Sequence, residues 1–348
     1  LYTAPEMEHQ LNDSKARVLV IIDLFSDKAD AVIAGTAVEH IVKISLLDFF
    51  PPLKKAVMGF VLRHVRKMVP AMRSSHVSLG NALKKGSAAR GKGNIDADAY
   101  RAGQTLDSVA LYQYTGGTTG RSKGAELTHR NILLNALAGV SLIIDEVPPR
   151  EGDCALVVLP LYHITAFVLI MLPGLQNGTH CIMIPSPRPP RNLKAAFENH
   201  SITHFSGINA LFAALLEEPW CTRQAVKHLR FCGSGGAAQH VEVARRWETL
   251  TGKPILQGYG MTECAGVLTM TPMGGNRLGC AGVPIPFMDV KIVDSQGNEL
   301  PRGEAGEGIA RGPVIMKGYL GRPEATAETI VDGWLHTGDI GVMDADGY

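Results

Sequence analysis

Short apolar runs alternate with amphipathic stretches along most of the chain, as in proteins that bury a parallel sheet between helices. In the first fifty residues, the pattern predicts a helix over 6–13 and strands at Val18–Ile22 and 38–44. Further strands are predicted at 109–114, 154–159, 179–184, 202–205, 229–232 and 254–257. Further helices are predicted at 129–139, 165–176, 191–198, 207–217 and 239–250. This regular alternation predicts an α/β fold with a doubly wound, mostly parallel sheet.

The pattern changes after Met273, where short strand patterns such as 290–293 and 308–311 lie among frequent Gly and Pro residues. We therefore expect an α/β region over 1–275 and a smaller β-rich subdomain over 276–348. The Gly- and Ser-containing segment 85–93 predicts a loop. Because the chain begins on Leu1 rather than Met and stops within a polar turn, we expect it to be part of a longer protein.

The composition is that of a folded protein, with 45% hydrophobic and 19% charged residues. No apolar run reaches the ~18 residues of a membrane span. The six Cys residues lack metal-site spacing, which predicts a reduced, cytoplasmic protein. The net charge of +1 hides an uneven distribution of charge along the chain. Residues 51–93 contain ten Lys and Arg residues and no Asp or Glu. Such a block predicts an anionic partner at one place.

A helical projection of residues 53–68 separates basic from apolar side chains. The basic side holds Lys55, Arg63, Arg66 and Lys67. The apolar side holds Leu53, Val57, Phe60, Val61, Val65 and Met68. A basic amphipathic helix can lie on an anionic membrane, so we expect peripheral contact with the inner face of the membrane. The alternative is a surface helix whose apolar side packs on the core. We expect no nucleic-acid partner, because few aromatic residues interleave with the charges.

The strongest chemical signal is a Gly- and Thr-rich loop between a predicted strand and a predicted helix. Its sequence is Tyr114-Thr115-Gly116-Gly117-Thr118-Thr119-Gly120-Arg121-Ser122-Lys123-Gly124. Bare N–H groups and hydroxyls can surround phosphate oxygens, and a Lys adds positive charge. The loop does not fit the Walker A pattern in any register. It therefore predicts a phosphate site of another kind, with a plain connecting loop as the alternative.

Two further motifs offer groups for other parts of a nucleotide. Gly258-Tyr259-Gly260-Met261-Thr262-Glu263 follows a predicted strand, where open α/β sheets bind ligands. Its Tyr ring can stack on a base, its Thr hydroxyl can contact a phosphate, and its Glu carboxylate suits Mg²⁺. The segment 332–339 ends on Thr-Gly-Asp, where Asp339 can accept both hydroxyls of a ribose. A polar β-turn is the alternative for this segment.

A competing interpretation comes from Gly233, Gly235 and Ala238, which satisfy the dinucleotide fingerprint at a strand-to-helix turn. No strand that ends on an acidic residue follows about twenty residues later, as that fingerprint requires. A Rossmann oxidoreductase therefore stays as an alternative from another class.

Taken together, the motifs resemble those of adenylate-forming enzymes. Segments 114–124, 258–263 and 334–339 are similar to the phosphate loop, the adenine and magnesium motif and the ribose motif of that family. The finer resemblance is to bacterial long-chain fatty-acid–CoA ligases, and it is carried by 1–6, 51–69, 159–163, 207–212 and 311–319. Gly308 departs from it, because the family usually has an aliphatic residue there. The resemblance implies a distorted barrel in the β-rich subdomain and a mobile C-terminal domain beyond this sequence.

The resemblance also implies a reaction and its residues. A fatty carboxylate would react with ATP to give acyl-adenylate and pyrophosphate, and coenzyme A would then displace AMP. The phosphates would be held by Thr115, Gly116, Gly117, Thr118, Thr119, Gly120, Ser122 and Lys123. Adenine would lie against Gly235, Gly236, Gly258 and Tyr259, and the ribose against Asp339. Catalytic roles are implied for Lys123, Thr262, Glu263 and His163, with Glu263 binding Mg²⁺. An enzyme for aryl or other acids and a silent nucleotide-binding module are the alternatives.

Overall fold

The computed structural model describes residues 3–96, 98–115 and 121–348, and it divides into two compact units. The first unit comprises Leu1–Thr105 and Tyr114–Gly124. The second comprises Leu106–Gln113 and Ala125–Tyr348. Across the described residues, every helix falls short of the length and apolarity needed to cross a membrane.

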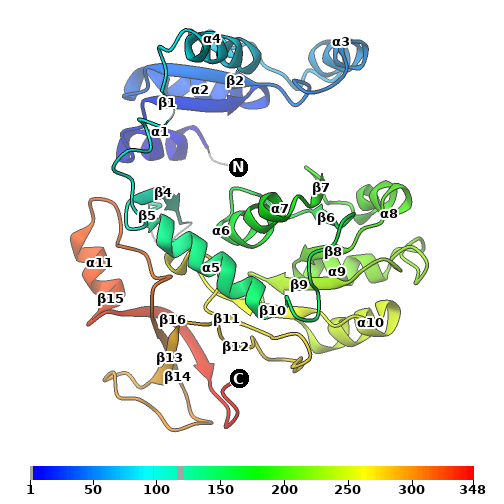
Figure 1. Ribbon diagram of the computed structural model, residues 1–348, viewed down its shortest axis with the longest axis vertical. Coiled ribbons are helices and arrows are strands. Elements are labelled where there is room, and N and C mark those ends of the chain that lie inside the picture. The colour runs from blue at the N-terminus through cyan, green and yellow to red at the C-terminus, as the bar shows by residue number, and fades with distance from the viewer. Residues whose placement is uncertain (1–2, 97, 116–120) are drawn as a thin grey trace. The chain divides into compact units, whose positions relative to one another are not determined.

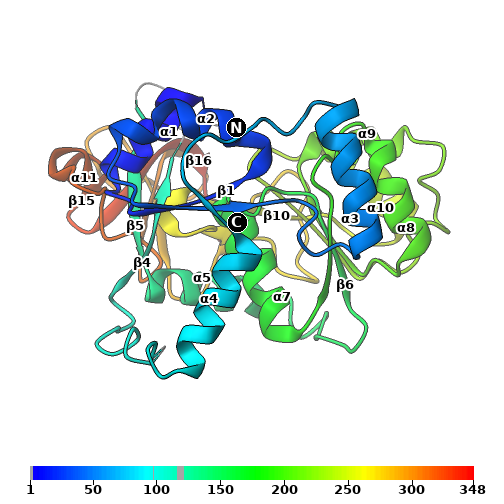
Figure 2. The same ribbon diagram turned by 90° about the horizontal axis from the view of Figure 1, so that it is seen from above.

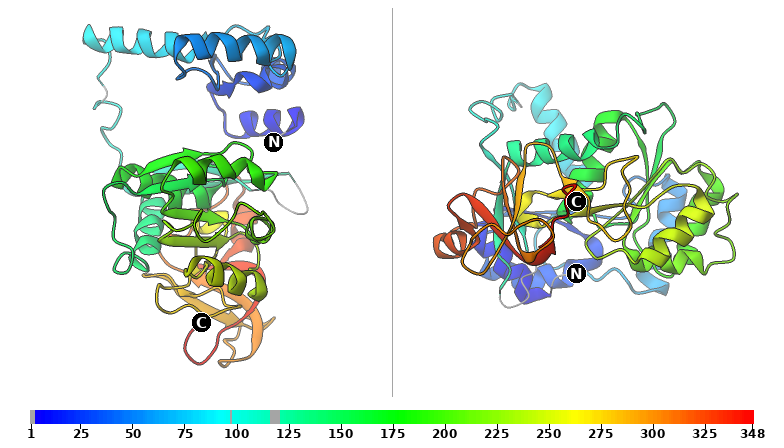
Figure 3. Two further views of the ribbon diagram at one scale, coloured as in Figure 1. Left: turned by 90° about the vertical axis from the view of Figure 1, so that its right-hand side faces the viewer. Right: turned by 90° about the horizontal axis from the view of Figure 1, so that it is seen from below.

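The first unit is built on a parallel sheet of order β1-β2-β3. Its strands are β1 Val18–Ile22, β2 His40–Ile44 and β3 Val77–Ser78. Its helical segments are α1 Ala4–Asp13, η1 Asp23–Phe25, α2 Ser26–Val32, η2 Ile33–Gly35, α3 Pro52–Phe60, η3 Val61–Val65 and α4 Leu79–Gly91. Ile21, Ala29 and Ile41 form a small core between the sheet and α2. In Figures 1 and 3, α3 and α4 lie on one side of this sheet and α1 on the other.

One prediction for this unit was wrong, and another was confirmed except at its end. The predicted loop over 85–93 is helical as far as Gly91, because Ala, Lys and Arg residues favour a helix more than the Gly residues disfavour it. Ser78 caps this helix by accepting a hydrogen bond from the Asn81 N–H at 3.4 Å. The predicted helix over 53–68 ends earlier, since α3 passes into the π-helical turn η3 and Lys67 has a φ of 51°.

The second unit is built on a seven-stranded sheet of order β12-β11-β10-β9-β8-β6-β7. Its strands are β6 Cys154–Val157, β7 His180–Met183, β8 His204–Gly207, β9 Phe231–Gly235, β10 Leu256–Tyr259, β11 Thr269–Met270 and β12 Val283–Pro284. The strands from β10 to β7 are parallel, and β11 and β12 extend the sheet in antiparallel orientation. The strands predicted between 154 and 257 are confirmed to within a few residues.

Helices cover both faces of this sheet (Figure 1). They are α5 His129–Ser141, α6 Ile164–Ala166, η4 Phe167–Met171, α7 Leu172–Asn177, η5 Pro190–Leu193, α8 Lys194–Asn199, α9 Asn209–Leu216 and α10 Val241–Thr251. On one face, α8, α9 and α10 pack around Phe205, Phe212 and Trp247. On the other, α5 and α6 pack around Ile132 and Ile164. The predicted doubly wound α/β fold is confirmed.

The predicted single helix over 165–176 is divided by the π-helical turn η4. Pro173 lacks the N–H that would close an ordinary helical turn onto Leu169, which explains why the wider turn lies just before it.

A four-stranded antiparallel sheet of order β13-β14-β16-β15 follows toward the C-terminus. Its strands are β13 Asp289–Val293, β14 Ala305–Arg311, β15 Ile330–Val331 and β16 Trp334–Val342. Two short helices lie in this part of the chain, η6 Thr262–Cys264 and α11 Pro323–Thr329. Earlier in the chain, β4 Val109–Tyr114 and β5 Gly124–Thr128 form a two-stranded sheet. The smaller β-rich part is confirmed, whereas its boundary at 275/276 stays a prediction.

An ion pair between the half-buried Arg230 and the buried Asp153 joins the starts of β6 and β9. Arg230 Nη1 lies 2.7 Å from Asp153 Oδ1, and the Arg150 N–H donates to Asp153 Oδ2 at 2.8 Å. Burial alone would raise the pKa of Asp153, but the hydrogen bonds from Arg230 and from the Arg150 N–H outweigh it. The pKa of Asp153 is therefore held below its usual value.

Candidate active site

Strands β9 and β10 bring two Gly-rich motifs side by side at their carboxyl ends. Gly235 pairs in register with Gly258, and a Cβ added to Gly235 would lie 3.1 Å from the Gly258 carbonyl oxygen. Gly236 follows with a φ of 75°, a left-handed conformation that favours glycine. The absence of side chains leaves bare backbone at the edge of the sheet where α/β proteins bind ligands.

The chain folds back sharply after β10. A Cβ added to Gly260 would lie 2.6 Å from the Cα of Val267, closer than real Cβ contacts allow. This close approach gives the turn η6, which carries Thr262 and Glu263. Glu263 is buried although it is acidic, so its carboxylate requires a partner.

That partner is Tyr319, whose hydroxyl donates to Glu263 Oε1 at 2.6 Å. The Met316 N–H also donates to the Glu263 carbonyl oxygen, at 2.8 Å. Burial raises the pKa of Tyr319, and the hydrogen bond to the carboxylate raises it further. The phenol therefore stays protonated at neutral pH and fixes the orientation of the Glu263 side chain.

Asp339 lies on a bulge in β16. In the ladder with β14, Glu307 pairs with Ile340 and Ile309 pairs with His336, so Gly308 alone faces residues 337–339. A bulge of this kind re-aims a side chain that a regular strand would place elsewhere.

Glu307 holds the bulge from the neighbouring strand. Its Oε1 accepts from the Gly338 N–H at 2.9 Å, and its Oε2 lies 2.9 Å from His336 Nδ1. Thr337 completes the arrangement by donating to the Gly308 carbonyl oxygen at 2.6 Å. Both carboxylate oxygens of Glu307 are thus used to position the segment that ends on Asp339.

The bulge brings Asp339 to Tyr259, a residue 80 positions away in the sequence. The Tyr259 hydroxyl donates to Asp339 Oδ2 at 2.6 Å. Burial raises the pKa of Tyr259, and the hydrogen bond to Asp339 raises it further. The two sequence motifs at 258–263 and 334–339, which were recognised separately, therefore meet at one place.

Helix α5 holds the loop that follows Glu263. Asn135 is fully buried, and its Nδ2 donates to the carbonyl oxygens of Cys264 and Val267 at 2.9 and 2.8 Å. Its Oδ1 accepts from the Val267 N–H at 3.3 Å. One side chain thus satisfies three backbone groups, one at the end of η6 and two in the irregular segment that follows it.

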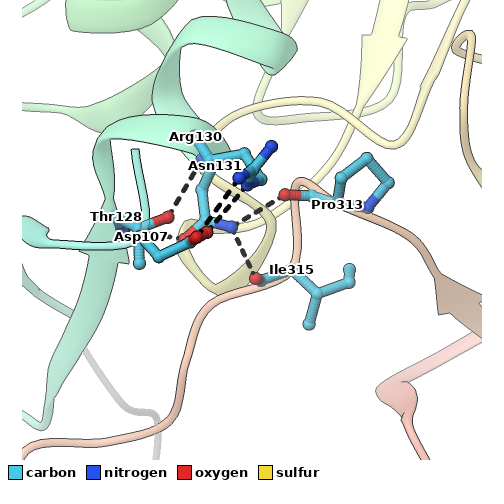
Figure 4. Close-up of polar contacts among 6 residues, drawn as sticks. All are labelled: Asp107, Thr128, Arg130, Asn131, Pro313 and Ile315. Atoms are coloured by element: carbon cyan, nitrogen blue, oxygen red, sulfur yellow. Dashed lines mark hydrogen bonds and ion pairs between the residues drawn. The ribbon is translucent and has the colours of Figure 1, made fainter. Parts of the chain in front are cut away.

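Asn131 lies one turn earlier on the same helix face, and its side chain hydrogen-bonds backbone groups of the segment before Tyr319. Figure 4 shows its Nδ2 donating to the carbonyl oxygens of Pro313 and Ile315, both at 2.8 Å. Its Oδ1 accepts from the Thr128 N–H at 2.8 Å, which caps the helix. The adjacent Arg130 pairs with Asp107 through two hydrogen bonds of 2.8 and 3.2 Å.

These positioning residues were not predicted from the sequence. Asn131, Asn135 and Glu307 are single polar residues without a spacing pattern, and their partners lie on distant elements. Tyr319 ends the run at 311–319 that carries the finer family resemblance, and this was the one signal in the sequence that pointed to it.

The predicted phosphate loop is described at its two ends. The Thr115 N–H donates to the Lys123 carbonyl oxygen at 3.0 Å, which closes the base of the loop. The Ser122 carbonyl oxygen accepts from His9 Nε2 at 2.9 Å. The remaining predicted residues, Gly116, Gly117, Thr118, Thr119 and Gly120, lie outside the described residues. The phosphate-binding role of the loop stays a prediction.

His163 occupies the N-cap of α6, with its side chain exposed. Its Nδ1 accepts from the Thr165 N–H at 3.4 Å. This contact fits a capping role, and the predicted catalytic role of His163 stays a prediction.

Comparisons with known proteins add to this geometry. The family described as AMP-binding enzyme matches residues 1–320. A long-chain-fatty-acid–CoA ligase of Salmonella typhimurium is 37% identical over 350 residues, which cover 100% of this chain and 61% of that protein. A feruloyl-CoA synthase of Amycolatopsis sp. is 39% identical over 245 residues, covering 70% of this chain and 49% of that protein. The crystal structure of ATP-bound MatB from Rhodopseudomonas palustris has a TM-score of 0.76 at 28% identity, covering 100% of this chain and 61% of that one.

Proposed function

Because this chain belongs to the AMP-binding enzyme family, of which it matches the model over residues 1–320, we propose that it functions as an ATP-dependent long-chain fatty-acid–CoA ligase. The chain spans 61% of the length of the Salmonella ligase that it resembles, so the activity of a whole enzyme is part of the proposal. Because the chain belongs to this family, we do not propose that Gly233, Gly235 and Ala238 form the dinucleotide site of a Rossmann oxidoreductase.

The proposed reaction has two steps. In the first, a carboxylate oxygen of the fatty acid attacks the α-phosphorus of ATP and pyrophosphate leaves. In the second, the sulfur of coenzyme A attacks the acyl carbon and AMP leaves. The first step turns a poor electrophile into one with a good leaving group. It therefore requires positioning and charge neutralisation more than a protein nucleophile.

The observation that carries the proposal is the meeting of Tyr259 and Asp339, with 2.6 Å between the hydroxyl and the carboxylate. A ribose between a base and a phosphate chain needs an acceptor for its hydroxyls beside a surface on which the base can lie. Asp339 supplies the acceptor, and Tyr259 with the bare backbone of Gly235, Gly236 and Gly258 supplies the surface.

Two buried polar atoms support a polar ligand at this edge of the sheet. Ser234 Oγ and Gln239 Oε1 are buried and make no hydrogen bond within the described chain. Each unsatisfied group costs about 1–3 kcal/mol unless another molecule pairs with it. The segment that holds them lies directly beside Gly235 and Gly236, where we propose that adenine binds.

The carboxylate of Glu263 also fits Mg²⁺ bound in the way that phosphate-transfer enzymes bind it. The described residues hold no group of three or more His, Cys, Asp and Glu side chains that could enclose a metal ion. Mg²⁺ instead prefers one or two carboxylates together with substrate phosphates. We propose that Glu263, oriented by Tyr319, supplies that carboxylate and that Thr262 contacts the α-phosphate. When bound, the ion would neutralise charge on the phosphates, as Lys123 would from the phosphate loop.

A second candidate is activation of an aryl acid. It is favoured by the similarity to a feruloyl-CoA synthase, 39% identical over 245 residues. The two candidates share the nucleotide chemistry and differ only in the acid.

The test is acid-dependent exchange of pyrophosphate into ATP, measured on the intact protein with saturated fatty acids from butyrate to stearate and with ferulate and benzoate. We expect the fastest exchange with long-chain acids. Lys123→Met and Glu263→Gln should each lower the rate about 100-fold, the usual cost of losing one electrostatic contact to a transition state. Lys194→Met and Glu198→Gln, which alter an exposed ion pair on α8, should leave it unchanged.

Each other outcome contradicts a particular part of the proposal. If Lys123→Met and Glu263→Gln both exchange pyrophosphate at the wild-type rate, the assignment of these residues to the site is wrong. Exchange with aryl acids alone would favour the second candidate. ATP binding without exchange would identify a silent nucleotide-binding module.

A further inference from the structure

The helical segment formed by α3 and η3, residues 52–65, presents its apolar side chains to solvent. Leu53, Val57 and Phe60 follow one another at spacings of four and three residues, which places them on one side of the helix. They are 79%, 57% and 62% exposed. Among these residues not one is buried. The alternative in which this apolar side packs on the core is therefore wrong.

A different side of the same segment faces its unit. Met58 and Leu62 are half-buried, and a Cβ added to Gly59 would lie 3.8 Å from a methyl carbon of the buried Leu47. The segment is thus attached through one narrow side, and its larger apolar side points away. Exposed Phe49 precedes the helix and extends the same apolar surface. We call Phe49, Leu53, Val57, Phe60, Val61 and Val65 the α3 surface.

Basic side chains border the α3 surface. Lys54 Nζ lies 5.1 Å from the ring centre of Phe50, and Arg63, Arg66 and Lys67 follow at the end of the segment. Lys55 is paired with Asp48 at 3.0 Å. Residues 51–93 contain no Asp or Glu, so apart from the paired Asp48 the charges along this part of the chain are positive.

The second basic helix of the unit lies on the same side. Helix α4 has no buried residue and carries Lys84, Lys85 and Arg90. Figure 3 shows α3 and α4 at one level of the first unit, and Figure 2 shows the same two helices from above. One side of this unit therefore combines an exposed apolar row with positive charge.

We propose that the α3 surface docks on an anionic lipid bilayer, with its apolar side chains below the headgroups and the basic side chains among them. An exposed apolar row costs free energy in water, and it is stabilised when it enters the acyl boundary. Basic residues add attraction to anionic headgroups at the same depth. This docking does not depend on the proposed ligase activity, because it requires neither ATP nor turnover.

The first experiment removes the apolar contact without changing charge. The chain is sedimented with vesicles of phosphatidylcholine and phosphatidylglycerol, and the double variant Leu53→Ser/Phe60→Ser is compared with Leu175→Ser/Phe287→Ser. The control pair has the same residue types at 73% and 70% exposure elsewhere in the chain. Burial of one such apolar side chain raises the partition coefficient onto the vesicle tenfold or more. We therefore expect vesicle binding to fall about 100-fold in Leu53→Ser/Phe60→Ser and to stay unchanged in the control.

The second experiment tests the charge. Arg63→Gln/Arg66→Gln should weaken binding roughly fivefold for each residue, whereas the control Arg223→Gln/Arg302→Gln should not. Binding of the wild type should weaken with added salt and should be lost on vesicles of phosphatidylcholine alone.

Three results would overturn the proposal. They are absence of wild-type binding to anionic vesicles, equal binding by Leu53→Ser/Phe60→Ser, and wild-type self-association in solution that this variant abolishes. The last result would assign the α3 surface to contact between two copies of the chain. Circular dichroism of each variant verifies that a loss of binding is not a loss of folding.

Discussion

The buried side chain of Asn135 leads to a quantitative prediction about stability. Asn135→Ala leaves two carbonyl oxygens and one N–H of the 264–267 loop without partners in the interior. Each buried unsatisfied group costs about 1–3 kcal/mol. A water molecule that enters the space left by the amide can restore part of this loss. We therefore expect the free energy of unfolding to fall by about 3–5 kcal/mol, a large share of the roughly 5–15 kcal/mol typical of a domain.

The chain offers a matched control. Asn192 also donates from Nδ2 to two carbonyl oxygens, those of Ser186 and Arg188 at 2.9 and 3.1 Å, but its side chain is exposed. Asn192→Ala should change the free energy of unfolding by less than about 1 kcal/mol, because water replaces the lost contacts.

The assay is urea unfolding followed by tryptophan fluorescence. All three Trp residues, at positions 220, 247 and 334, lie in the second unit, so the signal reports the unit that contains Asn135. A fall in the midpoint with an unchanged slope measures stability alone. Equal losses in the two variants would refute the reasoning, since burial is the property in which the two sites differ.

Three further predictions concern the site and the core. Gly260→Ala places a methyl group 2.6 Å from a backbone Cα and should lower the free energy of unfolding by about 1–3 kcal/mol, while Gly341→Ala, with a 3.7 Å contact, should not. Glu307→Gln should raise the KM for ATP about tenfold with kcat less affected, because the bulge that carries Asp339 loses a charged acceptor; an unchanged KM would contradict this. The Asp153 carboxylate stabilises the fold above its ordinary pKa of 3.8, and this stabilisation is lost as the pH falls through its lowered pKa. Asp153→Asn should therefore be less stable than the wild type at pH 7, and its stability should decline less steeply toward pH 3 in acid titrations.

The sequence predicted the sheets of this protein more accurately than its helices. Buried parallel strands are short, continuous apolar runs, and this pattern survives in any context that covers both faces. The helices α4 and α6 to α7 were less predictable. Glycine content suggested a loop where alanine and basic residues in fact favour a helix, and Pro173 changed the helix type without interrupting it.

The same distinction applies to the site. Motifs that follow a strand within a few residues were visible, because local chain geometry determines where they lie. Glu307, Asn131 and Asn135 were not visible, because their partners are backbone groups far away in the sequence. The bulge at 337–339 was also hidden, since a change of register depends on the pairing of two strands and not on either one alone.

The two asparagines of α5 have a consequence for ligand binding. They connect the loop after Glu263 and the segment before Tyr319 to a helix whose inner side belongs to the core. Release of either loop therefore requires the helix to give up buried contacts, so local opening and global unfolding are thermodynamically linked. A nucleotide that binds these loops at 100 times its Kd would add about 2.7 kcal/mol to the stability of the entire second unit. The melting temperature of this unit would then register occupancy even in a protein that completes no catalytic cycle.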